Sequence, residues 1–356
     1  MTLSIERVCN ELNRKGLLLP PNIRNLRQRW LREAGASAAD PVLFVKWLAH
    51  HGHVTDYQAD VLLRRRDDPL VLGPYKVRGR IGRGPMAGIY EAVHPLGQVV
   101  AIKVLPPARA ADPTVLARFK REARLAMRLH HPNVIRTFQA GEHHGTHFLV
   151  MELLRGETLK DVLLRRGRLP PAEAIRLLYQ AFLGLQHVHE QGLVHRDLEP
   201  ANLMLLSDKV DGGDITLNST VKILDIGLGR AVFDEGAPGA GPINLTATSD
   251  QLGTPLYCAP EQSKDARQAD IRSDIYSLGC VLYHALAGQP PFEDRGAVRL
   301  MLSHATEPPP RLTSLNLGVP AGLQAVLDRM LAKDPAFRFP VPEQAAEALR
   351  QFLTPR

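Results

Sequence analysis

The chain has 356 residues, of which 44% are hydrophobic and 23% are charged, as in ordinary globular proteins of one large or two smaller domains. No stretch contains the roughly 18 consecutive apolar residues of a membrane span, and no signal peptide is visible, so we expect a cytoplasmic protein without a membrane span. The net charge is +7, but the basic residues are scattered, which argues against a nucleic-acid partner. Three widely separated cysteines argue against a disulfide framework.

Residues 1–72 are expected to form a small helical module. Apolar residues recur at helical spacing in four segments, 5–16, 20–30, 41–48 and 55–62. Asp40 followed by Pro41 predicts the start of the third helix, and the capping-box spacing of Thr55 and Gln58 predicts the start of the fourth. This segment has no catalytic pattern, so we interpret it as a packing or docking module.

The periodicity changes at Gly73. Alternating apolar residues predict strands at 75–81, 89–93 and 99–105, with a glycine turn at 82–84 between the first two. Because a strand, glycine turn and strand form an antiparallel pair, the pattern argues against the Rossmann and Walker-A arrangements, in which the glycine loop opens a helix. A charged amphipathic helix is predicted at 113–130, followed by strands at 134–138 and 147–151.

Beyond Gly156 the pattern is mainly helical. The predicted helices span 158–165, 171–191, 274–287, 298–304, 323–331 and 343–352. Residues 208–220 are interpreted as an enlarged hairpin turn, and 233–242 as an irregular segment rich in glycine, alanine and proline. A sheet-rich first part and a helix-rich second part predict an α+β protein with two lobes.

Two histidine-rich segments, 50–53 and 143–147, invite a metal-binding interpretation. A glycine lies beside the first group and interrupts the second, so neither fixes two histidines on one helical face. Neither segment has cysteine or carboxylate partners at the spacing of metal ligands. We therefore interpret both as solvated loops.

Lys103 stands among apolar residues in the predicted strand Val100-Ala101-Ile102-Lys103. A lysine in such a position is costly to bury unless it is paired or bound to an anion. Glu122, on the helix that follows, is a candidate partner. The alternative is an exposed lysine on an edge strand.

The segment His195-Arg196-Asp197-Leu198-Glu199-Pro200-Ala201-Asn202 places several polar groups between two apolar runs. Such a loop can orient an acceptor hydroxyl with Asp197 and hold a metal ion with Asn202. Asp225 follows an apolar run and is followed by Ile226 and Gly227. Taken alone, Asp-x-Gly indicates a turn, but its place after Asp197 and Asn202 makes it a candidate second metal ligand.

Together these motifs resemble the eukaryotic-type (Hanks-type) serine/threonine protein kinases, in their bacterial branch, over about residues 74–353. Segment 253–261 resembles the end of an activation segment, and Arg338 matches the arginine that pairs with Glu261 in this family. The resemblance implies a bilobal protein-kinase-like fold over 73–353. Its parts would be an antiparallel-sheet N-lobe with one helix at 73–152 and a mainly helical C-lobe at 153–353.

The resemblance also implies a signalling enzyme that transfers the γ-phosphate of ATP to protein Ser or Thr hydroxyls with Mg²⁺, or alternatively Mn²⁺. Asp197 would be the proton acceptor, and Lys103, Glu122, Arg196 and Glu199 would complete the catalytic set. The implied ATP-binding residues are Ile81, Gly82, Arg83, Gly84, Ala87, Gly88, Ile89, Ala101, Lys103, Met151, Glu152, Asn202 and Asp225. Asn202 and Asp225 are the implied metal ligands.

The sequence departs from the family pattern at three positions. Glu199 stands where the serine/threonine branch has lysine, Ala87 replaces a glycine of the phosphate-covering loop, and Pro85 removes a backbone N–H from that loop. We expect an active but slow kinase. The alternatives are a pseudokinase that acts as a nucleotide-binding signalling scaffold and, more weakly supported, an enzyme that phosphorylates small molecules.

Arg196 places a positive charge next to the catalytic aspartate. In this family a phosphate on the activation segment neutralises such a charge and orders the segment. We therefore expect autophosphorylation at Thr246, Thr248 or Ser249.

Overall fold

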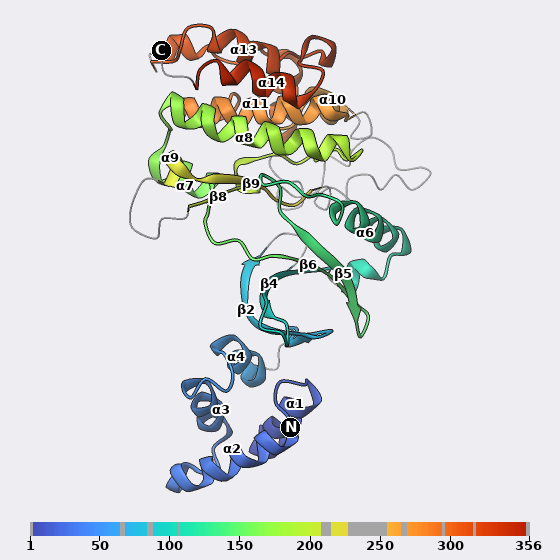
Figure 1. Cartoon of the computed structure of the whole chain (residues 1–356), viewed down its shortest axis with the longest axis vertical. Helices are drawn as coiled ribbons and strands as arrows, with labels where there is room; N and C mark the ends of the chain where they lie inside the picture. Colours follow the sequence, from blue (N-terminus) through green and yellow to red (C-terminus); the bar gives the residue numbers. More distant parts are fainter. Residues whose placement is uncertain are drawn as a thin grey trace. The chain divides into compact units, whose positions relative to one another are not determined.

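The structure, a computed structural model, describes residues 3–64, 68–83, 88–105, 107–207, 215–226, 255–264, 269–293, 296–315 and 318–353. It divides into two compact units, coloured along the sequence in Figure 1. The sheet unit comprises Met1–Asp112 and Phe138–Leu153, and the helical unit comprises Pro113–Thr137 and Leu154–Arg356. The division into a helical module at 1–72 and lobes that meet at residue 152 stays a prediction.

The first helices of the sheet unit form where the sequence predicts them. They are α1 (Ile5–Arg14), α2 (Pro20–Glu33), η1 (Gly35–Ser37), α3 (Pro41–His50) and α4 (Asp56–Arg64). The side chain of Asp40 accepts hydrogen bonds from the N–H groups of Val42 and Leu43, so it caps α3 as expected. Their apolar faces enclose a core of their own in which Phe44, Val45 and Leu48 are fully buried.

The remainder of the sheet unit is a six-stranded sheet with the order β1-β2-β3-β4-β6-β5. The strands are β1 (Val71–Leu72), β2 (Tyr75–Arg83), β3 (Gly88–Val93), β4 (Val99–Val104), β5 (Thr137–His143) and β6 (Thr146–Glu152), and a short helix α5 spans Pro107–Ala110. The pairs β2–β3, β3–β4 and β4–β6 are antiparallel, which confirms the predicted meander.

Helix α4 is bonded to strand β2 by the residues of its predicted capping box. The Gln58 N–H donates to Thr55 Oγ1 at 3.2 Å, and the Thr55 N–H donates to Gln58 Oε1 at 2.8 Å. The same side chains donate to the strand: Thr55 Oγ1 to the carbonyl of Arg78 at 2.6 Å, and Gln58 Nε2 to that of Val77 at 2.7 Å. These carbonyls lie where the β2–β3 register shifts, so α4 satisfies acceptors at an irregularity of the ladder.

The helical unit contains the remaining elements. Its longer helices are α6 (Pro113–Ala126), α7 (Leu159–Arg166), α8 (Pro171–Glu190), α11 (Ile271–Ala287), α12 (Ala297–Thr306), α13 (Leu323–Met330) and α14 (Pro342–Arg350). Its shorter elements are η2 (Pro200–Asn202), α9 (Ile215–Asn218), α10 (Pro260–Lys264), η4 (Leu312–Leu315), η5 (Pro335–Phe337) and the strands β7 (Glu157–Thr158), β8 (Leu203–Leu206) and β9 (Thr220–Ile223). The strands pair in the order β7-β8-β9.

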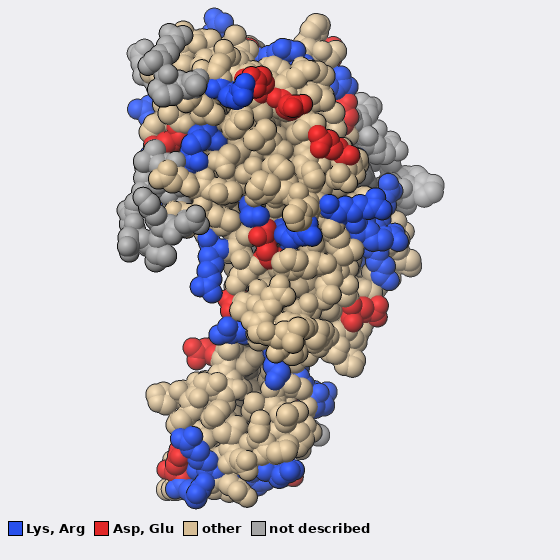
Figure 2. Space-filling model, in the orientation of Figure 1, with Lys and Arg blue, Asp and Glu red and all other residues tan. Residues whose placement is uncertain are grey.

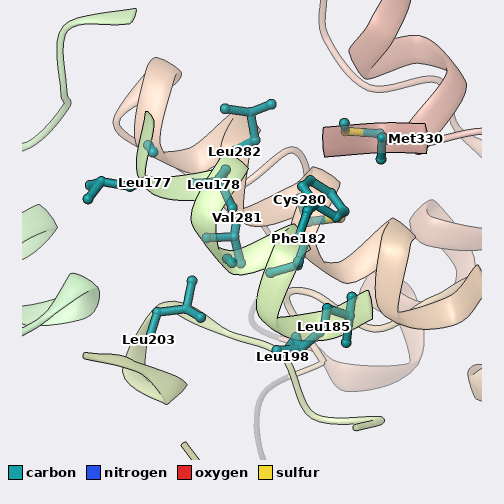
Figure 3. Packing of buried hydrophobic residues seen from close by; sticks show 14 of the residues in the cluster. Leu177, Leu178, Phe182, Leu185, Leu198, Leu203, Cys280, Val281, Leu282 and Met330 are labelled. Carbon is teal, nitrogen blue, oxygen red and sulfur yellow. The ribbon is translucent and has the colours of Figure 1, made fainter. Parts of the chain in front are cut away.

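Helices α8 and α11 supply the centre of the largest core. Figure 3 shows Phe182 and Leu185 of α8 with Cys280 and Val281 of α11, and all four side chains are fully buried. Leu198, between Asp197 and Glu199, belongs to the same cluster. Because burying a leucine stabilises a fold by roughly 1.5–3 kcal/mol, Leu198 holds the polar loop against the core.

Two local predictions are wrong. The strand predicted at 134–138 begins at Thr137, because the backbone at 133–135 instead bonds to Ile223 of β9. The helix predicted to reach residue 130 ends at Ala126, in turns that bury Leu129. The enlarged hairpin turn predicted at 208–220 is confirmed, because it connects the antiparallel strands β8 and β9. It contains a short helix, α9, and Arg176 donates to the carbonyl of Ser219 at 2.9 Å. Residues 208–214 and 233–242 lie outside the described residues.

Lys and Arg side chains gather over α6, and elsewhere on the face in Figure 2 charges of both signs are dispersed. Helix α6 carries Lys120, Arg121 and Arg124. In the part of the chain that the structure describes, no helix is both long and apolar enough to cross a lipid bilayer.

Candidate active site

The loop that follows α8 is anchored by one buried carboxylate. Asp274, in the first turn of α11, is fully buried and accepts hydrogen bonds from the N–H groups of His195 and Arg196, each at 2.7 Å. The ring of His189 contacts the same carboxylate at 2.8 Å. Burial opposes ionisation of Asp274, but the hydrogen bond to His189, the His189 and His195 rings and the backbone N–H of His195 together lower its pKa.

The backbone of Arg196 is fixed from both sides in a strained conformation. Its φ is +66°, in the left-handed region that costs a non-glycine residue about 1–2 kcal/mol. Its N–H donates to Asp274, and its carbonyl accepts from Gln262 Nε2 at 3.0 Å. Gln262 lies on α10, two residues after Pro260, so the end of the predicted activation segment supports the residue before Asp197.

His195 connects this loop to the segment that contains Asp225. The ring is 1% exposed, and its Nε2 lies 2.7 Å from the carbonyl of Leu224. Its Nδ1 lies 3.3 Å from the backbone N–H of Asp197, which donates to it. Since a carbonyl can only accept, the tautomer with the proton on Nε2 satisfies both contacts.

Asn202 connects Asp197 to the segment that contains Asp225. Its Nδ2 donates to the backbone carbonyl of Asp197 at 2.7 Å and lies 3.5 Å from Asp197 Oδ2. Its own carbonyl accepts from the N–H of Leu224 at 2.9 Å, directly before Asp225. Asp225 has a φ of +52°, a second strained position in the same site. The structure therefore brings Asp197, Asn202 and Asp225 together within the helical unit.

Four of the implied ATP-binding residues of the sheet unit share one face of the sheet. In the β3–β4–β6 register, Lys103 lies opposite Ile89 and Leu149, and Ala101 lies opposite Met151. Residues directly opposite each other in a sheet point to the same side, so Ile89, Ala101, Lys103 and Met151 form one surface. Lys103 is only 9% exposed.

The other implied ATP-binding residues are placed less uniformly. Gly82 lies opposite Ile89, Glu152 lies opposite Val100, and Ile81 is half exposed. Gly88 is opposite Val104, and a Cβ there would come within 2.6 Å of the Tyr90 ring, so only its backbone is available to a ligand. For Arg83 the structure describes the backbone alone.

Several predicted residues cannot be placed in the site. Gly84, Pro85 and Ala87 lie outside the described residues. Glu122 lies on α6 of the helical unit, whereas Lys103 belongs to the sheet unit. The pairing of Lys103 with Glu122 therefore stays a prediction.

The predicted pair of Glu261 and Arg338 is confirmed. Arg338 Nη1 and Nη2 donate to the two carboxylate oxygens of Glu261 at 2.7 and 2.9 Å, and the Arg338 side chain is fully buried. Ser273 Oγ donates to Glu261 Oε1 at 2.6 Å. Burial opposes ionisation of Glu261, but the hydrogen bonds and charge of Arg338 outweigh it and lower the pKa of that carboxyl.

Sequence reasoning missed two residues that shape the site, Asp274 and Gln262. Asp274 could have been found, because a carboxylate at the start of an otherwise apolar buried helix requires partners. Gln262 had no such signal, since glutamine is common on exposed helices. Both act on the loop through its backbone, which is why the pattern of side chains did not reveal them.

A family model described as protein kinase domain matches residues 75–350. The chain belongs to the protein kinase domain family. Among curated kinases it is 35% identical over 270 residues to serine/threonine-protein kinase PknB of Mycobacterium leprae, which covers 74% of this chain and 40% of that protein. It is 38% identical over 273 residues to PknA of Mycobacterium tuberculosis, which covers 75% of this chain and 58% of that protein. The kinase chain thus spans less than two-thirds of each relative.

Solved structures of kinases agree with this assignment. The Mycobacterium tuberculosis PknI kinase domain has a TM-score of 0.59 and 28% identity, over 79% of this chain and 97% of that one. A structure of Rad53 in complex with AMP-PNP has a TM-score of 0.62 at 21% identity, over 84% of this chain and 70% of that one, and supports the fold alone. The predicted kinase fold, with an antiparallel-sheet part and a mainly helical part, is confirmed.

Proposed function

We propose that this kinase domain transfers the γ-phosphate of ATP to serine or threonine hydroxyls of proteins. The observation that carries the proposal is the network that joins Asp197, Asn202 and Asp225. The similarity of this chain to PknB and PknA, both named serine/threonine-protein kinases, supports the same activity and does not favour the pseudokinase alternative.

The donor atoms near Asp197 fit a divalent cation such as Mg²⁺, with Mn²⁺ as an alternative. Asn202 uses Nδ2 to donate to Asp197, which leaves Oδ1 as the amide atom that can coordinate a cation. Asp225 adds a carboxylate, and hard cations prefer oxygen ligands of both kinds. When bound, the metal neutralises charge on the phosphate oxygens of ATP.

The residues of the chain position the acceptor hydroxyl and ATP. Asp197 orients the acceptor hydroxyl and accepts its proton, while the bond from Asn202 to the Asp197 carbonyl fixes the backbone that carries this carboxylate. Lys103 holds the phosphates of ATP, and Ala101 and Met151, on the same sheet face, contact its base.

Glu199 is the residue at which the catalytic loop departs from the pattern of the serine/threonine branch. The family's lysine at this position places a positive charge near the transferred phosphate, and a carboxylate removes it. Tyr257 has its pKa raised by burial first and by the charge of Glu199 second, so the carboxylate is close enough to Tyr257 to interact with it. We propose that turnover occurs but is slow.

The experiment measures phosphate transfer from labelled ATP to a generic protein substrate by the wild type, Asp197→Asn and Glu199→Lys. Transfer by the wild type that is lost in Asp197→Asn, with a faster rate in Glu199→Lys, is the expected result. No transfer by the wild type, with activity only in Glu199→Lys, would instead support a signalling scaffold.

We also propose that phosphorylation of Thr246, Thr248 or Ser249 neutralises the positive charge of Arg196. The three sites lie outside the described residues. Mapping of phosphorylated peptides after incubation with ATP should find at least one of them modified. Modification confined to residues before Gly73 would contradict this assignment.

A further inference from the structure

The sheet unit contains a cavity of about 780 Å³ that the proposed kinase reaction does not use. Parts of the chain that are distant in sequence line it. Arg14 and Lys15 come from the end of α1, Tyr90 and Val104 come from β3 and β4, and His143 and His144 come from the β5–β6 hairpin. A volume of this size suits a small organic molecule.

The cavity lies on the opposite face of the sheet from Lys103, Ala101 and Met151, three of the proposed ATP-binding residues. Val104 lines it and directly follows Lys103, while Tyr90 lines it and directly follows Ile89. Because successive residues of a strand point to opposite faces, a ligand in the cavity and ATP against Lys103 would be separated by the sheet. The cavity is therefore separated by the sheet from the surface of Ile89, Ala101, Lys103 and Met151, and it shares with the implied ATP-binding residues only Gly88.

The lining combines positive charge with apolar surface. The cationic side chains of Arg14, Lys15 and Arg80 outnumber the single carboxylate, Asp68. Arg14 is already paired with Glu11 at 2.8 Å, and Arg80 Nη1 lies 3.9 Å from Asp68 Oδ1. The apolar part comes from Val104 and the segment 69–72. Such a lining matches an anionic group attached to an apolar body.

The walls of the cavity are held in place by bonds within the sheet unit. Lys76 Nζ on β2 donates to the carbonyl of Leu17 at 2.8 Å, which holds the end of α1 beside the sheet. Tyr90 donates to Asp68 Oδ1 at 3.3 Å, and its ring lies 6.0 Å from that of Tyr57 on α4. The cavity is thus formed jointly by the N-terminal helices and the kinase sheet.

The hairpin that bears His143 and His144 has a tight two-residue turn. His144 has a φ of +49° and Gly145 has a φ of +76°, so both residues of this two-residue turn are left-handed. Turns of this kind favour asparagine, aspartate or glycine at the first position, and histidine is among the other residues that adopt the left-handed conformation more often than most. The turn therefore fixes the positions of both histidines at the edge of the cavity.

His143 provides a neutral hydrogen-bonding group. Its ring lies 4.1 Å from that of His144. Burial, followed by the neighbouring His144 ring, lowers the pKa of His143, so this ring is neutral at pH 7. A neutral imidazole can donate to an anionic oxygen without adding a charge that must be desolvated.

We infer that this cavity binds a small phosphorylated molecule with an apolar body, with the phosphate near Lys15 and Arg80 and the apolar part against Val104. Its charged wall comes partly from helix α1, so the N-terminal helices complete a ligand site and do more than pack against the sheet.

The test titrates 1-naphthyl phosphate into the full chain by calorimetry, a measurement that needs no phosphate transfer and so stands apart from the proposed kinase activity. We expect one molecule bound per chain, with no displacement by AMP-PNP. Lys15→Glu should weaken binding about tenfold or more, whereas Lys46→Glu, an exposed lysine on α3 that does not line the cavity, should leave it within about twofold.

A second variant separates loss of ligand from loss of folding. His144→Gly relieves the left-handed strain, so it should raise the melting temperature and still weaken binding of the probe. The inference is overturned if 1-naphthyl phosphate does not bind at millimolar concentration, if AMP-PNP displaces it, or if Lys15→Glu and His144→Gly bind as the wild type does. It is equally overturned if 1-naphthol or inorganic phosphate alone binds as tightly.

Discussion

The backbone N–H of Arg196 donates to Oδ1 of Asp274 at 2.7 Å, and this bond holds the residue before Asp197 at a φ of +66°. The other oxygen of the same carboxylate accepts from the N–H of His195. A single buried side chain at the start of α11 therefore determines the path of the loop that carries the proposed proton acceptor.

Asp274→Asn should lower both stability and phosphate transfer. The substituted amide puts an NH₂ group against one of the two backbone N–H donors, which leaves a buried donor without an acceptor. We expect a loss of about 2–4 kcal/mol in the free energy of unfolding, measured by urea denaturation. Asp328→Asn, at an exposed carboxylate on α13, is the control and should change the same quantity by less than about 0.5 kcal/mol. Equal stability of Asp274→Asn and the wild type would disprove the anchoring role.

Arg338→Met should destabilise the helical unit by about 3–5 kcal/mol, because it leaves the buried carboxylate of Glu261 without its bidentate partner. Arg350→Met is the matched control, since its pair with Glu347 at 3.0 Å is exposed and should contribute less than about 1 kcal/mol. Chemical denaturation of both variants checks the difference. Similar losses for the two arginines would show that burial does not strengthen the Glu261–Arg338 pair.

The Glu261–Arg338 pair should also make the stability of the protein depend on pH. The pKa of Glu261 is lowered in the folded protein, so its contribution is fully present above the unfolded pKa of about 4.3 and is lost as the pH falls through the folded value. Unfolding measured from pH 6 to pH 3 should therefore lose more stability in the wild type than in Glu261→Gln. Parallel curves for the two proteins would contradict the lowered pKa.

As the pH is lowered, the effect of His304 on stability should begin at a higher pH than that of Glu261. Burial, followed by the charge of Lys333, lowers its pKa to about 4, and Tyr276 OH lies 2.9 Å from its Nδ1. Because the unfolded chain binds a proton near pH 6.5 and the folded chain does not, stability should decrease by up to about 1.4 kcal/mol per pH unit between pH 6.5 and 4.

His304→Gln should flatten this part of the stability curve. The glutamine retains a hydrogen-bonding group for Tyr276 but does not titrate between pH 6.5 and 4. Thermal unfolding of both proteins at several pH values between these limits makes the comparison. A slope that is the same in both would assign the pH dependence to other groups.

Much of the fold followed from local patterns in the sequence. The helix starts at Asp40 and Thr55 were predicted correctly because capping depends on neighbouring residues. The strand around Val134 was predicted wrongly because its backbone pairs with Ile223, far along the chain, and no local pattern reports such a partner. Strand β5 is mostly exposed, so it has little apolar alternation to detect.

The candidate site shows the same limit. Asp197, Asn202 and Asp225 were predicted because their local motifs and their order match those of a family, and in the structure Asn202 bonds to Asp197 and to Leu224, directly before Asp225. The supports of Arg196 by Asp274 and Gln262 connect residues distant in sequence through a backbone carbonyl and N–H groups. Since the atoms of Arg196 that form these bonds belong to the backbone, the identity of its side chain does not reveal the contacts.

The most direct measurement of the central claim is the initial rate of Mg²⁺-dependent phosphate transfer to a protein substrate by the wild type and by Asp197→Asn, with Asp328→Asn as the control. We expect transfer by the wild type and the control, a reduction of at least about 100-fold in Asp197→Asn, and phosphate recovered on serine or threonine. Equal rates for the wild type and Asp197→Asn, or no transfer by the wild type in Mg²⁺ or Mn²⁺, would contradict the account.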